Sequence, residues 1–149
     1  MNRKPILPPT WLFASVVLMV GLHFVLPLAR IVPAPWNLAG LLPLVVGLWL
    51  NVRASGLFRR ASTTIKPFER PASLVADGPY RFSRHPMYLG MALVLVGVGV
   101  MLGTLGPLVV VPAFVWAMEV AFIRAEERDM EAVFGEEYRA YRRRVRRWI

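Results

Sequence analysis

The side chains in this chain that can carry charge stand at the borders of its long apolar stretches. His85 and Tyr88 lie at the start of one stretch, three residues apart, and therefore share a helix face. Glu119 and Glu126 lie at the end of another. Their separation of seven residues is nearly two helical turns, so they are expected on one face, with Glu127 about 100° round. Ionisable residues at membrane depth are costly to bury, so each of these positions is a candidate site residue.

Simpler interpretations of the same residues stay open at this stage. Glu126 and Glu127 are also what a solvated turn would carry, paired with Arg124 or Arg128. Arg53, at the end of a further apolar stretch, either reaches the lipid headgroups with its long side chain or contributes to a site. For Arg59, Arg60 and the arginines of the C-terminal tail, we expect contact with headgroups. His23 is expected to be a packed residue within the bundle.

The composition excludes several kinds of chemistry. The chain has no cysteine, so disulfides, thiol nucleophiles and cysteine-ligated metals are ruled out. Its two histidines are too few for a histidine-rich metal site, and we expect no metal centre.

The elements that must position these residues are membrane helices. The chain is 56% hydrophobic, with a net charge of +9 from 18 Lys+Arg against 9 Asp+Glu, and the charges are segregated from the apolar runs. Such a basic balance fits anionic lipid headgroups, and we expect no nucleic-acid partner. The interpretation is an all-α integral membrane protein of four transmembrane helices with a C-terminal cytoplasmic amphipathic extension, forming a single domain over residues 1–149.

The expected spans are residues 11–28, 33–52, 86–103 and 107–123. Residues 54–85 form a polar loop, broken by prolines, and residues 124–149 a cytoplasmic tail with two amphipathic pieces, separated at Gly135. The first span follows two basic residues but lacks a small-residue cleavage site, so we expect it to be retained. The spacing Gly99-x-x-x-Gly103 on the third span suits close helix packing.

The distribution of basic residues predicts the orientation. Lysines and arginines number two before the first span, one in the first connection, seven in the second, none in the third and eight in the tail. Both termini, the polar loop and the tail are therefore expected on the cytoplasmic side of the cell membrane. This reasoning leads to a polar pocket at the inner membrane boundary, but it names no reaction.

Two sequence blocks resemble a known family. The first is GPYRFSRHPMYLG over residues 78–90, and the second is the pair Glu126-Glu127 followed by FGEEYRAY over residues 134–141. In this order, flanking a glycine-containing helical hairpin, they resemble the isoprenylcysteine carboxyl methyltransferases and their phospholipid N-methyltransferase relatives. The resemblance covers roughly residues 40 to 149.

The resemblance implies transfer of a methyl group from S-adenosyl-L-methionine to a lipophilic substrate, a carboxylate, amine or thiol. It also implies that Arg53 and Glu127 are catalytic residues. The cofactor-binding residues that it implies are Ala72, Ser73, Leu74, Val75, Tyr80, His85, Pro86, Met87, Tyr88 and Glu126. Gly97 and Gly99 resemble a cofactor-proximal Gly-x-Gly, but helix packing would use them equally well. Phe122 stands where the carboxyl methyltransferases have a second basic residue, a role open to Arg124.

Two other classes of function remain as alternatives. One is a small non-catalytic membrane scaffold that binds anionic lipid through its arginines. The other is a transporter or a reductase-like relative on a similar bundle, although four spans lack the paired repeats of most transporters. The substrate and the oligomeric state are left open by the sequence.

Overall fold

The computed structural model describes residues 7–60 and 73–149. The described residues form helices and connections, with one isolated antiparallel bridge between Arg30 and Thr104. The longer helices are α1 (Pro8–Val25), α2 (Leu41–Arg60), α3 (Pro86–Leu102), α5 (Val110–Met118), α6 (Arg124–Phe134) and α7 (Glu136–Arg144). Short elements join them, namely the 3₁₀ turns η1 (Trp36–Gly40) and η2 (Gly78–Arg81), α4 (Leu105–Leu108) and the π turn η3 (Glu119–Ile123).

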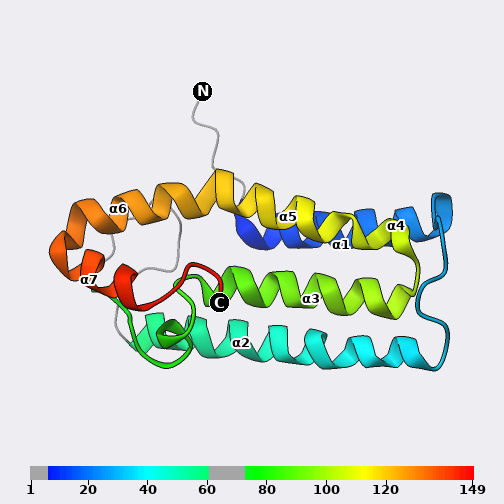
Figure 1. Ribbon diagram of the computed structural model, residues 1–149, viewed down its shortest axis with the longest axis horizontal. Helices are drawn as coiled ribbons and strands as arrows, with labels where there is room; N and C mark the ends of the chain where they lie inside the picture. The colour runs from blue at the N-terminus through cyan, green and yellow to red at the C-terminus, as the bar shows by residue number, and fades with distance from the viewer. Residues whose placement is uncertain (1–6, 61–72) are drawn as a thin grey trace.

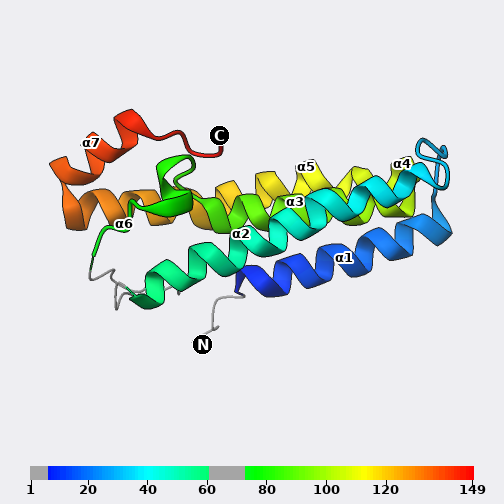
Figure 2. The same cartoon turned by 90° about the horizontal axis from the view of Figure 1, so that it is seen from below.

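Four helical rods run antiparallel to their chain neighbours, as Figures 1 and 2 show. α3 lies at the centre and packs against α1, α2 and α5, while α4, α5, η3 and α6 form one continuous helical run. The core between α1, α3 and α5 includes Met19, Leu95 and Met118, none of which is exposed. Large apolar side chains such as Phe13 and Trp116 point outward instead, as expected where the surrounding solvent is lipid.

Among the described residues, three helical runs are long and apolar enough to cross a membrane: Pro8–Val25, Trp36–Arg60 and Leu105–Phe134. The fourth expected span, α3, is an apolar helix of 17 residues and is shorter than these. The all-α class is thus confirmed for the described part of the chain. The first helix begins at Pro8 and ends at Val25, three residues earlier than expected, because Pro8 suits a first helical turn and Pro27 ends the run.

The second helix is longer than its apolar stretch. α2 continues to Arg60, so the start of the expected polar loop, from residue 54, is helical. Ala54 is completely buried there, and Phe58 contacts Tyr80 of η2 with ring centroids 5.4 Å apart. Tertiary contacts therefore extend the helix past the residues that hydropathy assigns to it.

Close backbone packing joins α2 and its 3₁₀ start to α3. A Cβ at Gly40 would lie 2.5 Å from the Gly97 carbonyl oxygen, and one at Gly47 would lie 2.5 Å from that of Gly90. The two pairs are seven residues apart on each helix, so they form a single line of contact between the antiparallel rods. Gly97 therefore serves helix packing, and Gly99 packs against Leu108.

The connections at one end of the bundle pair with each other. The Gly103 carbonyl accepts hydrogen bonds from the Ile31 and Val32 N–H groups at 2.9 and 3.1 Å. Gly103 has a φ of 72°, and a side chain there would meet the Val32 carbonyl oxygen. Within the bundle, His23 shares a 2.9 Å hydrogen bond with the Thr104 hydroxyl, in line with the packed role expected for it.

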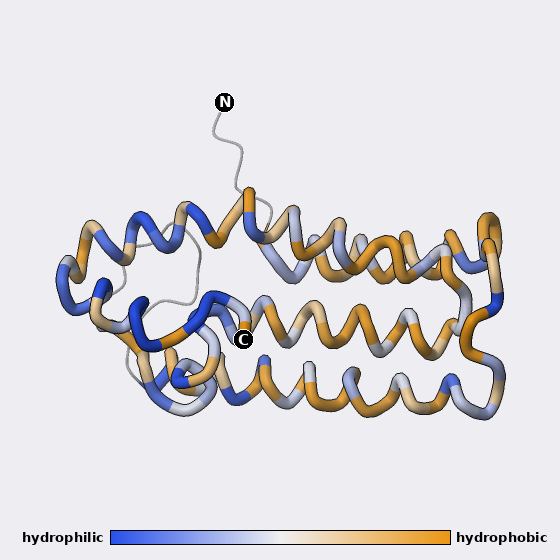
Figure 3. The backbone as a smooth tube through the Cα atoms, in the orientation of Figure 1, coloured by the Kyte–Doolittle hydropathy of each residue, from blue (hydrophilic) through white to orange (hydrophobic). Residues whose placement is uncertain are grey.

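The opposite end of the molecule is polar. Figure 3 shows apolar colours along the rods and hydrophilic colours where α6, α7, η2 and the last residues of the chain gather. α6 and α7 extend past the start of α1, and the chain then returns to the start of α3 (Figure 1). The second tail helix ends at Arg144, so the helical part of the tail stops short of its end, and residues 145–149 follow it without helical structure.

Candidate functional site

The polar segment before α3 is positioned by a local turn. Pro86 occupies the first turn of α3 and is completely buried, and His85 precedes it at the N-cap position of the helix. The buried Ser83 hydroxyl accepts a hydrogen bond from the His85 N–H at 3.2 Å and donates one to the Arg147 carbonyl at 3.2 Å. This turn directs the His85 ring toward α6.

Glu126 approaches this segment from the first turn of α6. The Tyr88 hydroxyl donates a 2.6 Å hydrogen bond to Oε1 of Glu126, and Nδ1 of His85 lies 3.6 Å from its Oε2. The Tyr88 ring also stacks on Phe122, with centroids 6.3 Å apart. The structure thus brings together three residues that the sequence analysis assigned to cofactor binding.

Glu127 lies deeper, among cations. Its side chain is 9% exposed, against 24% for Glu126. Oε1 of Glu127 lies 3.0 Å from a terminal nitrogen of Arg84 and 3.4 Å from Nε2 of His85, and Arg147 donates to both carboxylate oxygens. Glu127 is therefore held in a buried ion network.

The electrostatics of His85 follow from these two carboxylates. Burial by itself disfavours the imidazolium and lowers the pKa, but the hydrogen bonds with Glu126 and Glu127 and their negative charges outweigh it. The net effect raises the pKa of His85 above its usual range.

Arg84, His85, Tyr88, Glu126 and Glu127 form a polar cluster at the start of α3. Tyr80 links this cluster to the tail. The ring is buried, and the Tyr80 carbonyl accepts a 2.6 Å hydrogen bond from the Tyr141 hydroxyl of α7. Burial first, and then the nearby Tyr141 and Glu126, raise the pKa of Tyr80 well above its usual range. Tyr138, Tyr141 and Val145 form a second apolar cluster, against which Leu74 packs.

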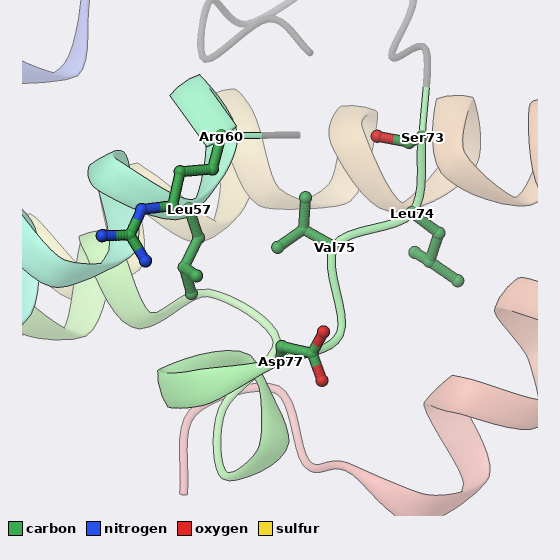
Figure 4. A pocket seen from close by; sticks show the side chains of 6 residues that line it. All are labelled: Leu57, Arg60, Ser73, Leu74, Val75 and Asp77. Atoms are coloured by element: carbon green, nitrogen blue, oxygen red, sulfur yellow. The ribbon is translucent and has the colours of Figure 1, made fainter. Parts of the chain in front are cut away.

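The loop residues assigned to the cofactor line a separate hollow. Ser73, Leu74 and Val75 border a pocket of about 440 Å³ together with Leu57, Arg60 and Asp77, as Figure 4 shows. The pocket adjoins η2, since a Cβ at Gly78 would lie 3.0 Å from Cδ1 of Leu57. Ala72 lies outside the described residues.

Two further residues, Arg53 and Met87, were assigned to the site from the sequence. Arg53 is exposed on α2. At 100° per residue it is about 120° round the helix from the centre of the face that Gly47, Ala54 and Phe58 present to α3 and η2. Met87 is partly buried in the first turn of α3, beside the cluster.

The π turn changes which acidic residues act together. Glu119 was expected to share a helix face with Glu126. Instead it accepts a 2.9 Å hydrogen bond from Arg147, which also binds Glu127. The wider turn of η3 shifts the register by about one residue, so positions eight apart converge instead of positions seven apart. Arg124 lies 3.7 Å from Glu119, which is not the partner that the solvated-turn interpretation gave it.

Arg147 is the residue that the sequence analysis missed. It was grouped with the tail arginines expected at the headgroups, yet its guanidinium lies between Glu119 and Glu127. No local signal marks it among the six arginines of residues 139–147, because its partners lie 20 and 28 residues earlier in the chain.

The comparison with protein families identifies the family of this chain. The phospholipid methyltransferase family matches residues 36–137, more than half of the chain, and these include the cluster residues from Arg84 to Glu127. The chain belongs to this family. The family resemblance inferred from the two sequence blocks is confirmed.

Curated relatives match the chain over about half of its length. A protein-S-isoprenylcysteine O-methyltransferase of Schizosaccharomyces pombe is 32% identical over 72 residues, which are 48% of this chain and 30% of the relative. The cobalt-zinc-cadmium resistance protein CzcN of Cupriavidus metallidurans is 36% identical over 73 residues, 49% of this chain and 33% of the relative. The chain thus spans about a third of the length of these two proteins.

A further relative is matched along its whole length. An uncharacterised protein of Haemophilus influenzae is 36% identical over 63 residues, which are 42% of this chain and all of that protein. No solved structure matches the chain.

Proposed function

We propose that this family member is an integral membrane methyltransferase that uses S-adenosyl-L-methionine and acts on a lipophilic substrate at the cytoplasmic membrane face. The observation that carries the proposal is the convergence of His85, Tyr88 and Glu126 at the polar end of an apolar bundle. The family match and the isoprenylcysteine methyltransferase relative support the reaction class.

The proposed topology has four spans, with both termini in the cytoplasm. α3, at 17 residues, measures about 26 Å, which approaches the thickness of the hydrocarbon core. It packs against the neighbouring rods on several sides, so it needs less lipid-facing length than the outer helices. The basic residues of the tail lie at the end of the bundle from which α3 starts, in line with the positive-inside rule.

The residues of the cluster fit the methyl donor chemically. Glu126 is a partly exposed carboxylate, suited to an ammonium group or to ribose hydroxyls, and Tyr88 places an aromatic ring beside it. Nε and one terminal nitrogen of Arg84 are buried and lack an acceptor among the described residues. Unpaired N–H donors of this kind suit an anionic oxygen, so the carboxylate of the methyl donor would find a partner here.

The protein's contribution to the transfer is positioning. S-adenosyl-L-methionine supplies a methyl group activated by a sulfonium centre. Glu126, oriented by the Tyr88 hydroxyl and by His85, would hold the donor by charge-assisted hydrogen bonds. The apolar rods beside the cluster would admit the lipophilic substrate from the membrane and exclude water. In this proposal Ser73, Leu74 and Val75 complete the cofactor-binding residues from the neighbouring pocket.

A binding measurement followed by a methylation assay tests the proposal. Purified protein in detergent is titrated with S-adenosyl-L-methionine by calorimetry and then incubated with labelled cofactor and a total membrane lipid extract. We expect saturable binding and transfer of label to a lipid-soluble product, whose identification defines the substrate as a carboxylate, amine or thiol.

Failure of both measurements would end the enzyme hypothesis. If the protein bound vesicles of anionic lipid but showed no affinity for S-adenosyl-L-methionine, the non-catalytic scaffold would be the better description. As a matched control for the binding site, Glu137→Gln removes an exposed carboxylate of α7 and should leave binding unchanged.

A further inference from the structure

Residues 145–149 fold back from α7 onto the segment that precedes α3. The Arg84 N–H donates a 3.0 Å hydrogen bond to the Arg146 carbonyl, and the Ser83 hydroxyl bonds to the carbonyl of Arg147. Trp148 is partly buried against the bundle core, and its indole N–H lies 3.5 Å from Glu119. This segment is therefore attached to the site through its backbone and its side chains.

The guanidinium of Arg147 uses all three nitrogens. Nε donates to Oε1 of Glu127 at 3.0 Å, one terminal nitrogen donates to Oε2 at 2.6 Å, and the other donates to Oε1 of Glu119 at 2.9 Å. The contact with Glu127 is bidentate, which sets the plane of the carboxylate as well as its position. The third bond ties that carboxylate to the π turn.

One of the two Glu127 oxygens that Arg147 holds also faces His85. Oε1 of Glu127 lies 3.4 Å from Nε2 of His85, and the other ring nitrogen of His85 lies 3.6 Å from Glu126. Rotation of the Glu127 carboxylate would thus change the contact at Nε2 of His85. Because the other ring nitrogen faces Glu126, the position of the Glu126 carboxylate would change as well.

We propose that Arg147 is a positioning residue, which fixes the Glu127 carboxylate so that His85 and Glu126 are correctly placed for the cationic methyl donor. The effect on cofactor affinity rests on the proposed function; the coupling to His85 does not. The family match ends at residue 137, so this role belongs to a segment beyond the matched region.

Three variants separate positioning from net charge. Arg147→Ala removes the guanidinium that binds Glu127 and Glu119, whereas Arg147→Lys keeps the charge but not the bidentate geometry. Arg144→Ala removes an exposed arginine of α7 and is the matched control. The first readout is the affinity for S-adenosyl-L-methionine in detergent. We expect a loss of about tenfold or more for Arg147→Ala, a smaller loss for Arg147→Lys and no change for Arg144→Ala.

The second readout is the NMR titration of His85 in the protein without ligand. The groups facing it are Glu126, Glu127 and Tyr88, with Arg84 and Arg147 bound to or beside the same carboxylates. Removing the Arg147 cation leaves Glu127 less neutralised, so the His85 midpoint should move to higher pH in Arg147→Ala and much less in Arg147→Lys.

The outcomes distinguish the two proposals. An Arg147→Ala protein with unchanged cofactor affinity and an unchanged His85 titration would overturn the positioning role. An equal affinity loss in Arg144→Ala would also overturn it and would point to overall charge. If the parent protein bound no S-adenosyl-L-methionine, the proposed function would fail, while the His85 titration would still decide whether Arg147 positions the cluster. If Arg147→Ala did not fold, the comparison of Arg147→Lys with the parent protein would decide.

Discussion

Glu126 is the more accessible carboxylate of the adjacent pair, because its neighbour is enclosed by Arg84, His85 and Arg147. One of its oxygens accepts from Tyr88 and the other lies 3.6 Å from Nδ1 of His85, while 24% of the side chain stays exposed and can meet a ligand. A cationic ligand in the cluster should therefore depend on Glu126 more than on any other single side chain.

Glu126→Gln tests this dependence. The amide keeps the size of the side chain but removes its charge, and a hydrogen bond to a charged group contributes about 1.5–3 kcal/mol. We expect the affinity for S-adenosyl-L-methionine, measured by calorimetry in detergent, to fall at least about tenfold. Unchanged affinity, with normal folding, would remove Glu126 from the site.

His85 makes stability depend on pH. Its pKa is raised in the folded protein, so its ion pairing stabilises the fold fully below the pKa of the unfolded histidine. That stabilisation is lost as the pH rises through the folded-state pKa. We expect the excess thermal stability of the parent protein over His85→Gln to decrease with rising pH in that window. A difference that stayed constant or grew would contradict the assigned coupling to Glu126 and Glu127.

At the scale of elements, the α2–α3 contact depends on the absence of side chains. A Cβ at Gly47 would lie 2.5 Å from the Gly90 carbonyl oxygen and 2.9 Å from the Val94 nitrogen, and backbone atoms cannot move aside cheaply. Gly56, on the same helix, has open space around its Cα. The two glycines therefore provide a matched pair of sites.

Gly47→Ala should destabilise the protein by about 1–3 kcal/mol, the usual effect of overpacking. Gly56→Ala should be neutral or stabilising by about 0.5–1 kcal/mol, because alanine favours the helix. Thermal unfolding in detergent, followed by circular dichroism, checks both. Equal melting temperatures for the two variants would mean that the rods do not approach as described.

At the scale of the whole molecule, the site requires that the segment before α3 and the tail lie on one side of the membrane. The chain has no cysteine, so single cysteines can be introduced for accessibility labelling without other changes. We expect Phe82→Cys and Glu137→Cys to be labelled by an impermeant reagent only after the cells are opened, and Arg30→Cys to be labelled in intact cells. If one of the cysteines at positions 82 and 137 were labelled in intact cells and the other only in opened cells, the two segments would lie on opposite sides of the membrane and the proposed site would be excluded.

Several features of this protein could be read from its sequence. Long uncharged apolar runs predict membrane helices because burial in lipid depends on composition along a short stretch. The two blocks that include His85 and Glu126 indicated the family, which the comparison confirms. The helical hairpin of α3 and α5 also follows from a local signal, since Gly103 marks the turn that ends α3.

Only the tertiary structure decided which charged groups meet. The extension of α2 to Arg60 depends on contacts with η2, and the π turn lets Glu119 and Glu127 bind the same guanidinium, that of Arg147. Arg147 reaches these carboxylates because α7 folds the chain back onto the start of α3. Contacts between residues this far apart in sequence depend on how the whole chain folds, so local periodicity and composition cannot predict them.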